Sequence, residues 1–183
     1  KGKHIFMNCD DPEESHFWKY FKLNFDFLGL SKITSTYYHP LEPTYRLDYD
    51  GKEIIKTPLE QNGDFRSPEA IEILKEVDIV VTNPPFSLFR EYIAQLVKYD
   101  KNFIVIGNMN AITYKEIFPL LKDNKIWLGQ NNGVMEFVIP ENSPEKSGQR
   151  IDENGIKYQK FGNIAWYTNM NAPRRNEEIV LYE

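Results

Sequence analysis

The sequence predicts an α/β fold, in which a mainly parallel sheet carries helices on both faces and ends in an antiparallel edge. Buried strands alternate with amphipathic helices along the first two thirds of the chain, an order typical of parallel strands with helical crossovers. The last third is rich in strand-like segments, which predicts the antiparallel edge. The 183 residues, 41% of them hydrophobic, suit one domain with a buried core.

Four elements are expected in the first part of the chain. Phe17, Phe21 and Phe25 recur at helical spacing, and Gly29 is expected to end that helix. The dipeptide Asp50-Gly51 suits the tight turn of a hairpin. The expected elements are a strand over 4–8, a helix over 15–30, a strand over 32–38 and a hairpin over 45–56.

The middle of the chain alternates helix and strand. Ser67 followed by Pro68 is a typical helix start, with the serine as N-cap and the proline in the first turn. The unbroken apolar centre of "DIVVTN" predicts a strand buried on both faces. The expected elements are a helix over 67–77, a strand over 78–83, a helix over 87–99 and a strand over 102–108. The side chains expected to face inward from the two helices are Ile71, Leu74, Val77, Phe89, Ile93, Leu96 and Val97.

The last elements are less regular. A helix is expected over 113–122, because Thr113 and Glu116 form a capping-box pattern, and Pro119 should kink or shorten it. The polar segment 141–155 predicts a mobile surface loop. The strand-like segments are 125–129, 134–140, 163–169 and 177–183.

Composition narrows the function classes. The net charge of −5 argues against strong non-specific nucleic-acid binding by this chain alone, but leaves open a local basic patch or a basic partner domain. Cys9 is the only cysteine, and the three histidines have no metal-ligand spacing, so neither a disulfide nor a metal is expected. No apolar run is long enough to span a membrane, and the start is not a secretory signal. A cytoplasmic protein is the default expectation.

Four motifs follow strands and should meet at one edge of the sheet. Ligands of open parallel sheets bind at the carboxyl ends of the strands. That edge collects "NCDDP", "TYYH", "NPPF" and "GNMNA".

The motif "NPPF" points to methyl transfer to an amino group. Asn83 and two prolines should form a stiff corner at a strand end. An exocyclic amino nitrogen is a poor nucleophile, and two acceptors on its hydrogens would free its lone pair. The side-chain oxygen of Asn83 and the carbonyl of Pro84 can be those acceptors, with Pro85 adding stiffness and Phe86 stacking on a flipped base. The alternative is a proline-stiffened turn with a buried phenylalanine.

Two other motifs suggest a cofactor site. In "NGDFRS", Asp64 can accept a hydrogen bond from an adenine amino group while Phe65 packs on the ring; the alternative is an ordinary loop. In "NCDDPEES", Asp10 or Asp11 can take an amine or a hydroxyl, beside free backbone amides of a helix start. The alternative there is a helix N-terminus with favourable acids. The absence of a glycine-rich fingerprint argues against dinucleotide binding.

The chain resembles the EcoRI-type adenine-specific DNA methyltransferases over nearly its whole length. The resemblance rests on "NCDDPEESHFWKYF", "NGDFRSPEAIEILKEVDIVVTNPPFSLFREY", "IGNMNAITYKEIFPL" and "GNIAWYTNM", and the block "TNPPFSLFREY" is its most specific part. It implies a Rossmann-like methyltransferase fold with a seven-stranded sheet. It also implies S-adenosylmethionine as cofactor, S-adenosylhomocysteine as product, and no metal.

The resemblance also implies roles for residues. The catalytic motif would be Asn83, Pro84, Pro85 and Phe86. Asp64 and Phe65 would lie by the adenine of the cofactor. The methionine end would be lined by Asn8, Cys9, Asp10, Asp11 and Pro12. The substrate would be duplex DNA with a flipped adenine, in a restriction-modification setting with a possible cognate restriction endonuclease.

Three departures from the family pattern are visible. A leading segment resembling "NDEFYT", which helps to close the cofactor site, is absent before residue 1, and a C-terminal recognition region is expected beyond residue 183. Residues 1–183 would therefore be the catalytic domain of a longer protein. The end of the strand at "TYYH" has no acid for the ribose hydroxyls, which leaves Asp48 or Asp50 as substitutes. Alternatives are methylation of RNA bases or of a protein glutamine, or a catalytically silent cofactor-binding module.

Overall fold

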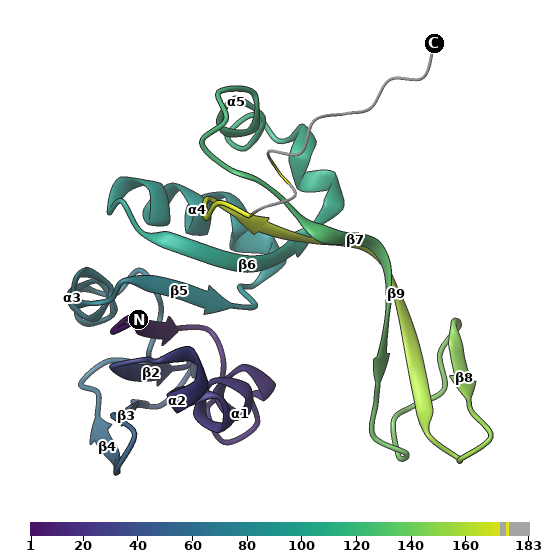
Figure 1. Ribbon diagram of the computed structural model, residues 1–183, viewed down its shortest axis with the longest axis horizontal. Coiled ribbons are helices and arrows are strands. Elements are labelled where there is room, and N and C mark those ends of the chain that lie inside the picture. The colour runs from purple at the N-terminus through teal and green to yellow at the C-terminus, as the bar shows by residue number, and fades with distance from the viewer. Residues whose placement is uncertain (173–174, 176–183) are drawn as a thin grey trace.

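The structure is a computed structural model that describes residues 1–172 and 175, and its centre is one large twisted sheet (Figure 1). Strands β2, β1, β5 and β6 are parallel, and antiparallel strands flank them on both sides. In sheet order the strands are β4 (Ile54–Pro58), β3 (Tyr45–Tyr49), β2 (Lys32–Thr36), β1 (His4–Met7), β5 (Ile79–Thr82), β6 (Asn102–Asn108), β9 (Lys157–Thr168) and β7 (Trp127–Val138), with β8 (Gln149–Ile151) on β9.

The predicted Rossmann-like α/β class is confirmed, with nine strands in the described sheet in place of seven. The hairpin at Asp50-Gly51 adds β3 and β4 beside β2, as expected, and the short strand β8 lies within the predicted loop 141–155. The expected strand over 177–183 lies outside the described residues.

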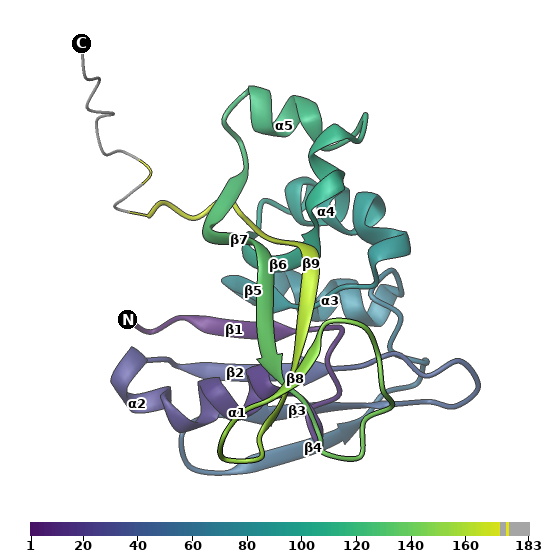
Figure 2. The same ribbon diagram turned by 90° about the vertical axis from the view of Figure 1, so that its right-hand side faces the viewer.

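Helices cover both faces of the sheet (Figure 2). One face packs on α1 (His16–Leu23) and α2 (Phe25–Leu28), through Trp18 and Phe25. The other face packs on α3 (Pro68–Glu76), α4 (Phe89–Lys98) and the segment from the 3-10 turn η2 (Met109–Thr113) to α5 (Phe118–Lys122). Because strand side chains alternate, Phe6 points to the second face while Ile5 and Met7 point to the first.

The helix expected over 15–30 is broken at Asn24. The side-chain amide of Asn24 donates to the carbonyl oxygen of Tyr20 at 2.8 Å, and its backbone leaves helical geometry at φ −100° and ψ 15°. Asparagine competes with the helix for backbone partners in this way. The chain therefore turns between α1 and α2, and Phe27 is left 88% exposed.

The prediction of a helix over 113–122 is wrong for the first half of that segment. The Thr113 hydroxyl donates to the Asn110 carbonyl at 2.8 Å and closes a 3-10 turn, so no capping box forms. The α-helix begins only at Phe118, with Pro119 in its first turn, where a proline costs no hydrogen bond. Downstream, the segments expected as two strands over 125–129 and 134–140 form the single strand β7.

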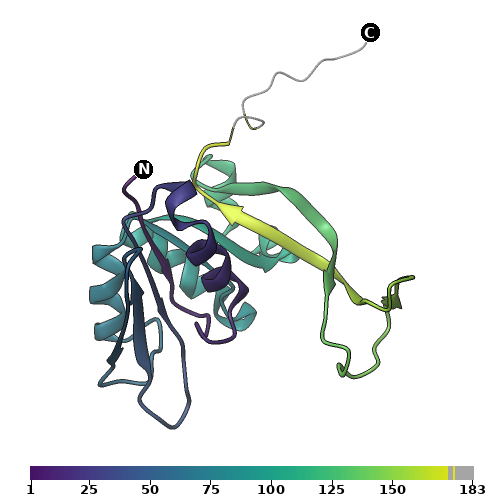
Figure 3. The ribbon, with the colours of Figure 1, turned by 60° about the horizontal axis from the view of Figure 1, so that its bottom comes forward.

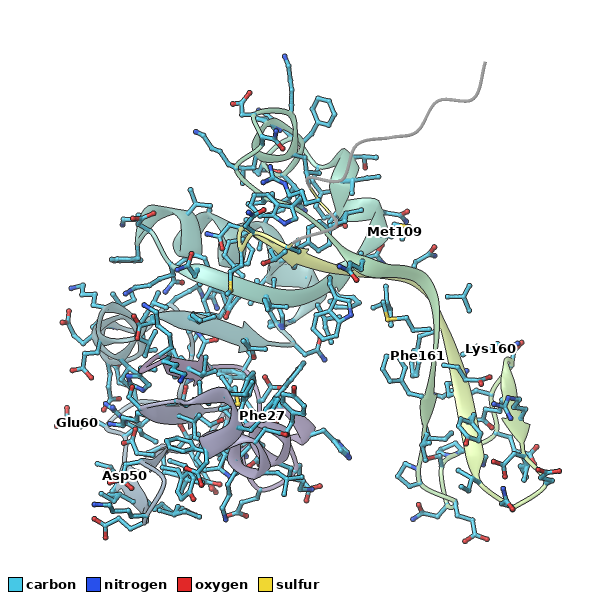
Figure 4. The ribbon with its side chains drawn as sticks, in the orientation of Figure 1. Phe27, Asp50, Glu60, Met109, Lys160 and Phe161 are labelled. Atoms are coloured by element: carbon cyan, nitrogen blue, oxygen red, sulfur yellow. The ribbon has the colours of Figure 1, made fainter. Side chains whose placement is uncertain are left out.

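A long hairpin arm is formed by the outer halves of β7 and β9 (Figures 1 and 3). Asn108, the last residue of β6, pairs with Ile164 of β9, so the part of β9 before Ile164 runs beyond the carboxyl edge of the parallel strands. Phe137 and Phe161 meet on one face of the arm, with ring centroids 5.7 Å apart. Figure 4 shows Phe161 pointing toward the helical body and Lys160 pointing away from it.

The loop that leads from β4 to α3 is bound to the loop that follows β2. The His39 amide donates to the Asn62 carbonyl at 2.9 Å, and the Thr44 amide donates to the Gln61 carbonyl at 3.2 Å. Gly63, which follows Asn62, has φ +73°, and a Cβ placed there would stand 1.9 Å from the carbonyl oxygen of Tyr37 in the other loop. Only glycine fits this position, because it accepts a positive φ and lets the two loops touch.

Ile93→Ala should lower the free energy of unfolding by about 2–5 kcal/mol, because Ile93 is fully buried in the core below α4. Val97, one turn later, was expected to face inward but is 40% exposed, so that prediction is wrong. Val97→Ala should therefore cost less than about 1 kcal/mol. Urea unfolding of both variants measures the difference, and equal losses would contradict this orientation of α4.

Gly63→Ala should lower the free energy of unfolding by about 2–4 kcal/mol, through backbone strain and the clash with Tyr37. Gly155 is a matched control, because it has φ +80° but nothing within 4 Å of an added Cβ. Gly155→Ala should cost only about 1 kcal/mol. Thermal and urea unfolding compare the pair, and an equal effect would mean that the contact between the loops is not tight.

Candidate active site

A cavity of about 490 Å³ lies at the carboxyl edge of the parallel strands. It is walled by four segments far apart in the sequence, which are the turn after β1, the end of β2, the loop before α3 and the corner after β5. The residues that were expected at the site and that line this cavity are Asn8, Cys9, Asp11, Asp64, Phe65, Asn83 and Pro85. A second, more open cavity of about 350 Å³ adjoins it and shares Cys9, Asp11 and Asn83.

The corner after β5 presents Asn83 to both cavities. Pro84 is buried beneath it, whereas Asn83 and Pro85 are exposed. Phe86 lines neither cavity, is 42% exposed, and begins the 3-10 turn η1 (Phe86–Leu88). The Leu88 amide donates to the Pro85 carbonyl at 3.0 Å, which leads the chain directly into α4. The corner is therefore a rigid projection between strand and helix.

The turn after β1 is anchored from below. Asn8 is almost fully buried, and its side-chain oxygen accepts a hydrogen bond from the hydroxyl of Tyr92 in α4. The Cys9 amide donates to the Thr82 hydroxyl at 3.2 Å. Burial raises the pKa of the Cys9 thiol far above its usual range, so the sulfur stays protonated and is not a nucleophile.

Asp10 lies away from the larger cavity, although it was expected to bind the cofactor there. Its carboxylate accepts hydrogen bonds from the Thr82 hydroxyl and from the Asn83 backbone amide, the latter at 3.2 Å. Burial raises the pKa of Asp10, and these two donors oppose that rise. Its side chain lines only the second cavity.

Of the next two residues expected at the site, Asp11 lines the cavities and Pro12 does not. A side-chain oxygen of Asp11 accepts from the Glu13 amide at 3.0 Å and from the Tyr45 hydroxyl at 3.4 Å, and Asp11 borders both cavities. Pro12 is buried and lines neither of them. Asp11 is therefore the acid of this turn that reaches both cavities.

Asp64 is fixed by its neighbour Arg66. The guanidinium of Arg66 donates to both carboxylate oxygens of Asp64, at 2.9 and 2.7 Å, and its backbone amide donates at 2.8 Å. These bonds hold the pKa of Asp64 below its usual range, so it is a carboxylate at neutral pH. Arg66 also binds Glu91 of α4 at 3.2 Å, which ties this loop to the helix after Asn83.

Phe65 forms the floor of the cavity. It is only 4% exposed and meets Tyr92 edge-on, with ring centroids 5.0 Å apart. Its carbonyl accepts from the side-chain amide of Gln95 at 2.9 Å. Most of the ring therefore packs in the core, and only part of it is available to a ligand.

Sequence reasoning missed several lining residues, namely Tyr37, Tyr38, Gly63, Arg66 and Leu88. The two tyrosines stand at the end of β2, in the motif "TYYH", and were placed at the edge but given no role. Leu88 and Arg66 carried no signal, because a leucine before a helix and an arginine in a loop are common. Gly63 was visible in the motif, but its contact with Tyr37 depends on the fold.

The two acids considered for the ribose hydroxyls do not reach the cavity. Asp48 is buried beside Thr34, Lys32 and Arg46, with ion-pair distances of 3.0 and 2.7 Å. Asp50 accepts from two amides of its own turn, at 2.9 and 3.1 Å. Both carboxylates therefore stabilise the sheet edge.

Within residues 1–172 and 175, no group of three or more His, Cys, Asp or Glu side chains could hold a metal ion. No helix in this part of the chain is long and apolar enough to cross a membrane.

Comparison with known proteins identifies relatives over most of the chain. Type II methyltransferase M.EcoRI of Escherichia coli is 43% identical over 200 aligned residues, which cover 98% of this chain and 61% of that protein. Type II methyltransferase M.MpnI of Mycoplasma pneumoniae is 42% identical, with 93% of this chain and 54% of that protein covered. Type II methyltransferase M.MgeORF184P of Mycoplasma genitalium is 40% identical, with 96% and 56% covered.

The chain thus spans between 54% and 61% of the length of these relatives. No solved structure gave a significant match. The family described as adenine-specific methyltransferase EcoRI matches two segments, residues 1–50 and 43–183, which together cover the chain. The chain therefore belongs to the EcoRI family of adenine-specific methyltransferases.

Proposed function

We propose that residues 1–183 are the catalytic domain of a DNA methyltransferase that moves a methyl group from S-adenosylmethionine to the amino group of a flipped adenine. The observation that carries this proposal is the position of Asn83. It stands where two adjoining cavities meet, and the larger of them is bordered by Asp11, Asp64 and Phe65. The names of the relatives support a restriction-modification setting.

The residues of the larger cavity fit the cofactor. The fixed carboxylate of Asp64 is an acceptor for an adenine amino group, and Pro85, Leu88 and part of Phe65 give an apolar slot for the ring. The carboxylate of Asp11 lies in the turn after β1, where it can take the ammonium group of the methionine end. When bound, S-adenosylmethionine supplies a methyl group activated by the positive sulfonium.

Asn83 and Pro84 would prepare the attacking nitrogen. The side-chain oxygen of Asn83 and the Pro84 carbonyl would each accept one hydrogen of the adenine amino group. The nitrogen lone pair then turns out of conjugation with the ring and becomes available for an in-line attack. Because two prolines restrict the backbone of this corner, these acceptors would need little reorganisation. Phe86, exposed at the rim, would stack on the flipped base.

Duplex DNA is the proposed substrate, and its recognition is proposed to involve more than this chain. The net charge of −5 gives this chain little general attraction for phosphates. The relatives are longer, and the matching parts cover at most 61% of them. We therefore assign base-sequence recognition mainly to the remainder of the protein, and we place the protein in the cytoplasm with a cognate restriction endonuclease.

Asn83→Ala should lower the rate of methyl transfer at least about 100-fold, because it removes an acceptor used at the reacting nitrogen. The affinity for S-adenosylmethionine should stay within about twofold of that of the unmodified protein. Radiolabel transfer by the full-length protein to DNA, RNA and protein substrates, with calorimetry for the cofactor, measures both. Asn154→Ala, in an exposed turn of the hairpin arm, is the control and should change neither. Label on RNA or protein alone, or an active Asn83→Ala variant, would overturn the proposal.

Asp64→Ala should weaken binding of S-adenosylmethionine by about tenfold, because it removes a charge-assisted acceptor from the cavity wall. Asp152→Ala is the matched control, since Asp152 also accepts amides of its own loop, at 2.9 Å, but lies in the arm. The dissociation constants of both variants should be measured by calorimetry. An unchanged constant for Asp64→Ala would remove Asp64 from the cofactor site.

A further inference from the structure

We propose that Asp10 is a positioning residue, which holds the backbone of Asn83 in its working orientation through a direct hydrogen bond and through Thr82. This inference rests on the proposed function, since Asn83 is the residue that is positioned. It gives Asp10 a role different from that of a cofactor ligand.

The bonds around Asp10 form a closed link between the ends of two strands. One carboxylate oxygen of Asp10 accepts from the Thr82 hydroxyl and from the Asn83 amide, the latter at 3.2 Å. The Thr82 hydroxyl in turn accepts from the Cys9 amide at 3.2 Å. The turn after β1 and the corner after β5 are therefore joined at two neighbouring residues on each side.

The Asn83 amide is the only backbone donor in the corner from Asn83 to Pro85. Neither proline has an N–H group, so the carboxylate of Asp10 holds the one main-chain donor that these three residues have. Pro84 also biases Asn83 toward an extended backbone. The bond to Asp10 and the bias from Pro84 act on the same residue, and together they limit the direction of the Asn83 side chain.

The backbone of Asp10 is fixed by hydrogen bonds, and its carboxylate lies where burial disfavours a charge. The Ser35 hydroxyl donates to the Asp10 carbonyl at 2.8 Å and to the Met7 carbonyl at 3.0 Å, which attaches the turn to β2. Burial raises the pKa of Asp10, so its charge is unfavourable where it lies. A carboxylate kept in such a place, turned toward the corner and outside the larger cavity, is suited to positioning.

The test uses the full-length protein and four changes. Asp10→Ala, which removes the acceptor, and Thr82→Val should each lower kcat by about 10- to 100-fold, while the dissociation constant for S-adenosylmethionine stays within about threefold. Thr82→Ser keeps the hydroxyl and should restore kcat to within about threefold of the unmodified protein. In an Asn83→Ala background, Asp10→Ala should add less than a twofold loss, because both changes affect one unit.

If the unmodified protein is active, two outcomes would overturn the inference. The first is an Asp10→Ala variant with a normal kcat and a dissociation constant raised tenfold or more, which would make Asp10 a cofactor ligand. The second is a full, independent loss in the double variant. If the unmodified protein transfers no methyl group to DNA, the proposed function fails, and the inference is then decided by NMR alone. The Asn83 amide resonance should shift clearly in Asp10→Ala and not in Thr82→Ser, and no shift in Asp10→Ala would refute the link.

Discussion

The side-by-side pairing of β1 and β5 is the constraint on which the site depends. From β1 the chain crosses to β2 on one side, and from β5 it crosses to β6 on the other. The connecting segments must therefore separate just beyond the carboxyl ends of this pair, which leaves a crevice at the switch point of the sheet. Only a few residues, such as Ile5 with Ile79 and Phe6 with Val80, set the register that brings the two ends level.

The polar groups around this crevice are largely satisfied within the protein. Asp64 is paired with Arg66, and Asn8 with Tyr92, so neither has to be reorganised before a ligand binds. Fixed dipoles of this kind are effective because their orientation has already been established during folding. The hydrophobic core supports the arrangement directly, since Tyr92 of α4 holds Asn8 from below and contacts the ring of Phe65. The geometry of the site therefore depends directly on the packing of the core around Tyr92.

Much of the fold could be predicted from the sequence because its signals are local. The cap at Ser67 and the turn at Asp50-Gly51 each depend on two or three adjacent residues, and both occur as expected. The break at Asn24 was missed, since a helix-spaced apolar pattern outweighed a single competing side chain. The inward side of α4 was misjudged at Val97, because the sheet below the helix decides which positions are covered.

The motifs of the candidate site were visible, but their internal partners were not. Asp10 and Thr82 are 72 positions apart, so their bond follows only from the pairing of β1 with β5.

The hairpin arm depends on the arrangement of the elements in a different way. In the described chain the arm packs against no helix, and cross-strand contacts such as that of Phe137 with Phe161 stabilise it. Such a ribbon opens at a lower free energy than the sheet from which it grows. Amide hydrogens of the arm will exchange with solvent while those of β1 and β5 remain protected. One sheet therefore contains both a stable part, the pair β1 and β5 beside the crevice, and a part that opens easily, the arm that extends beyond the same edge.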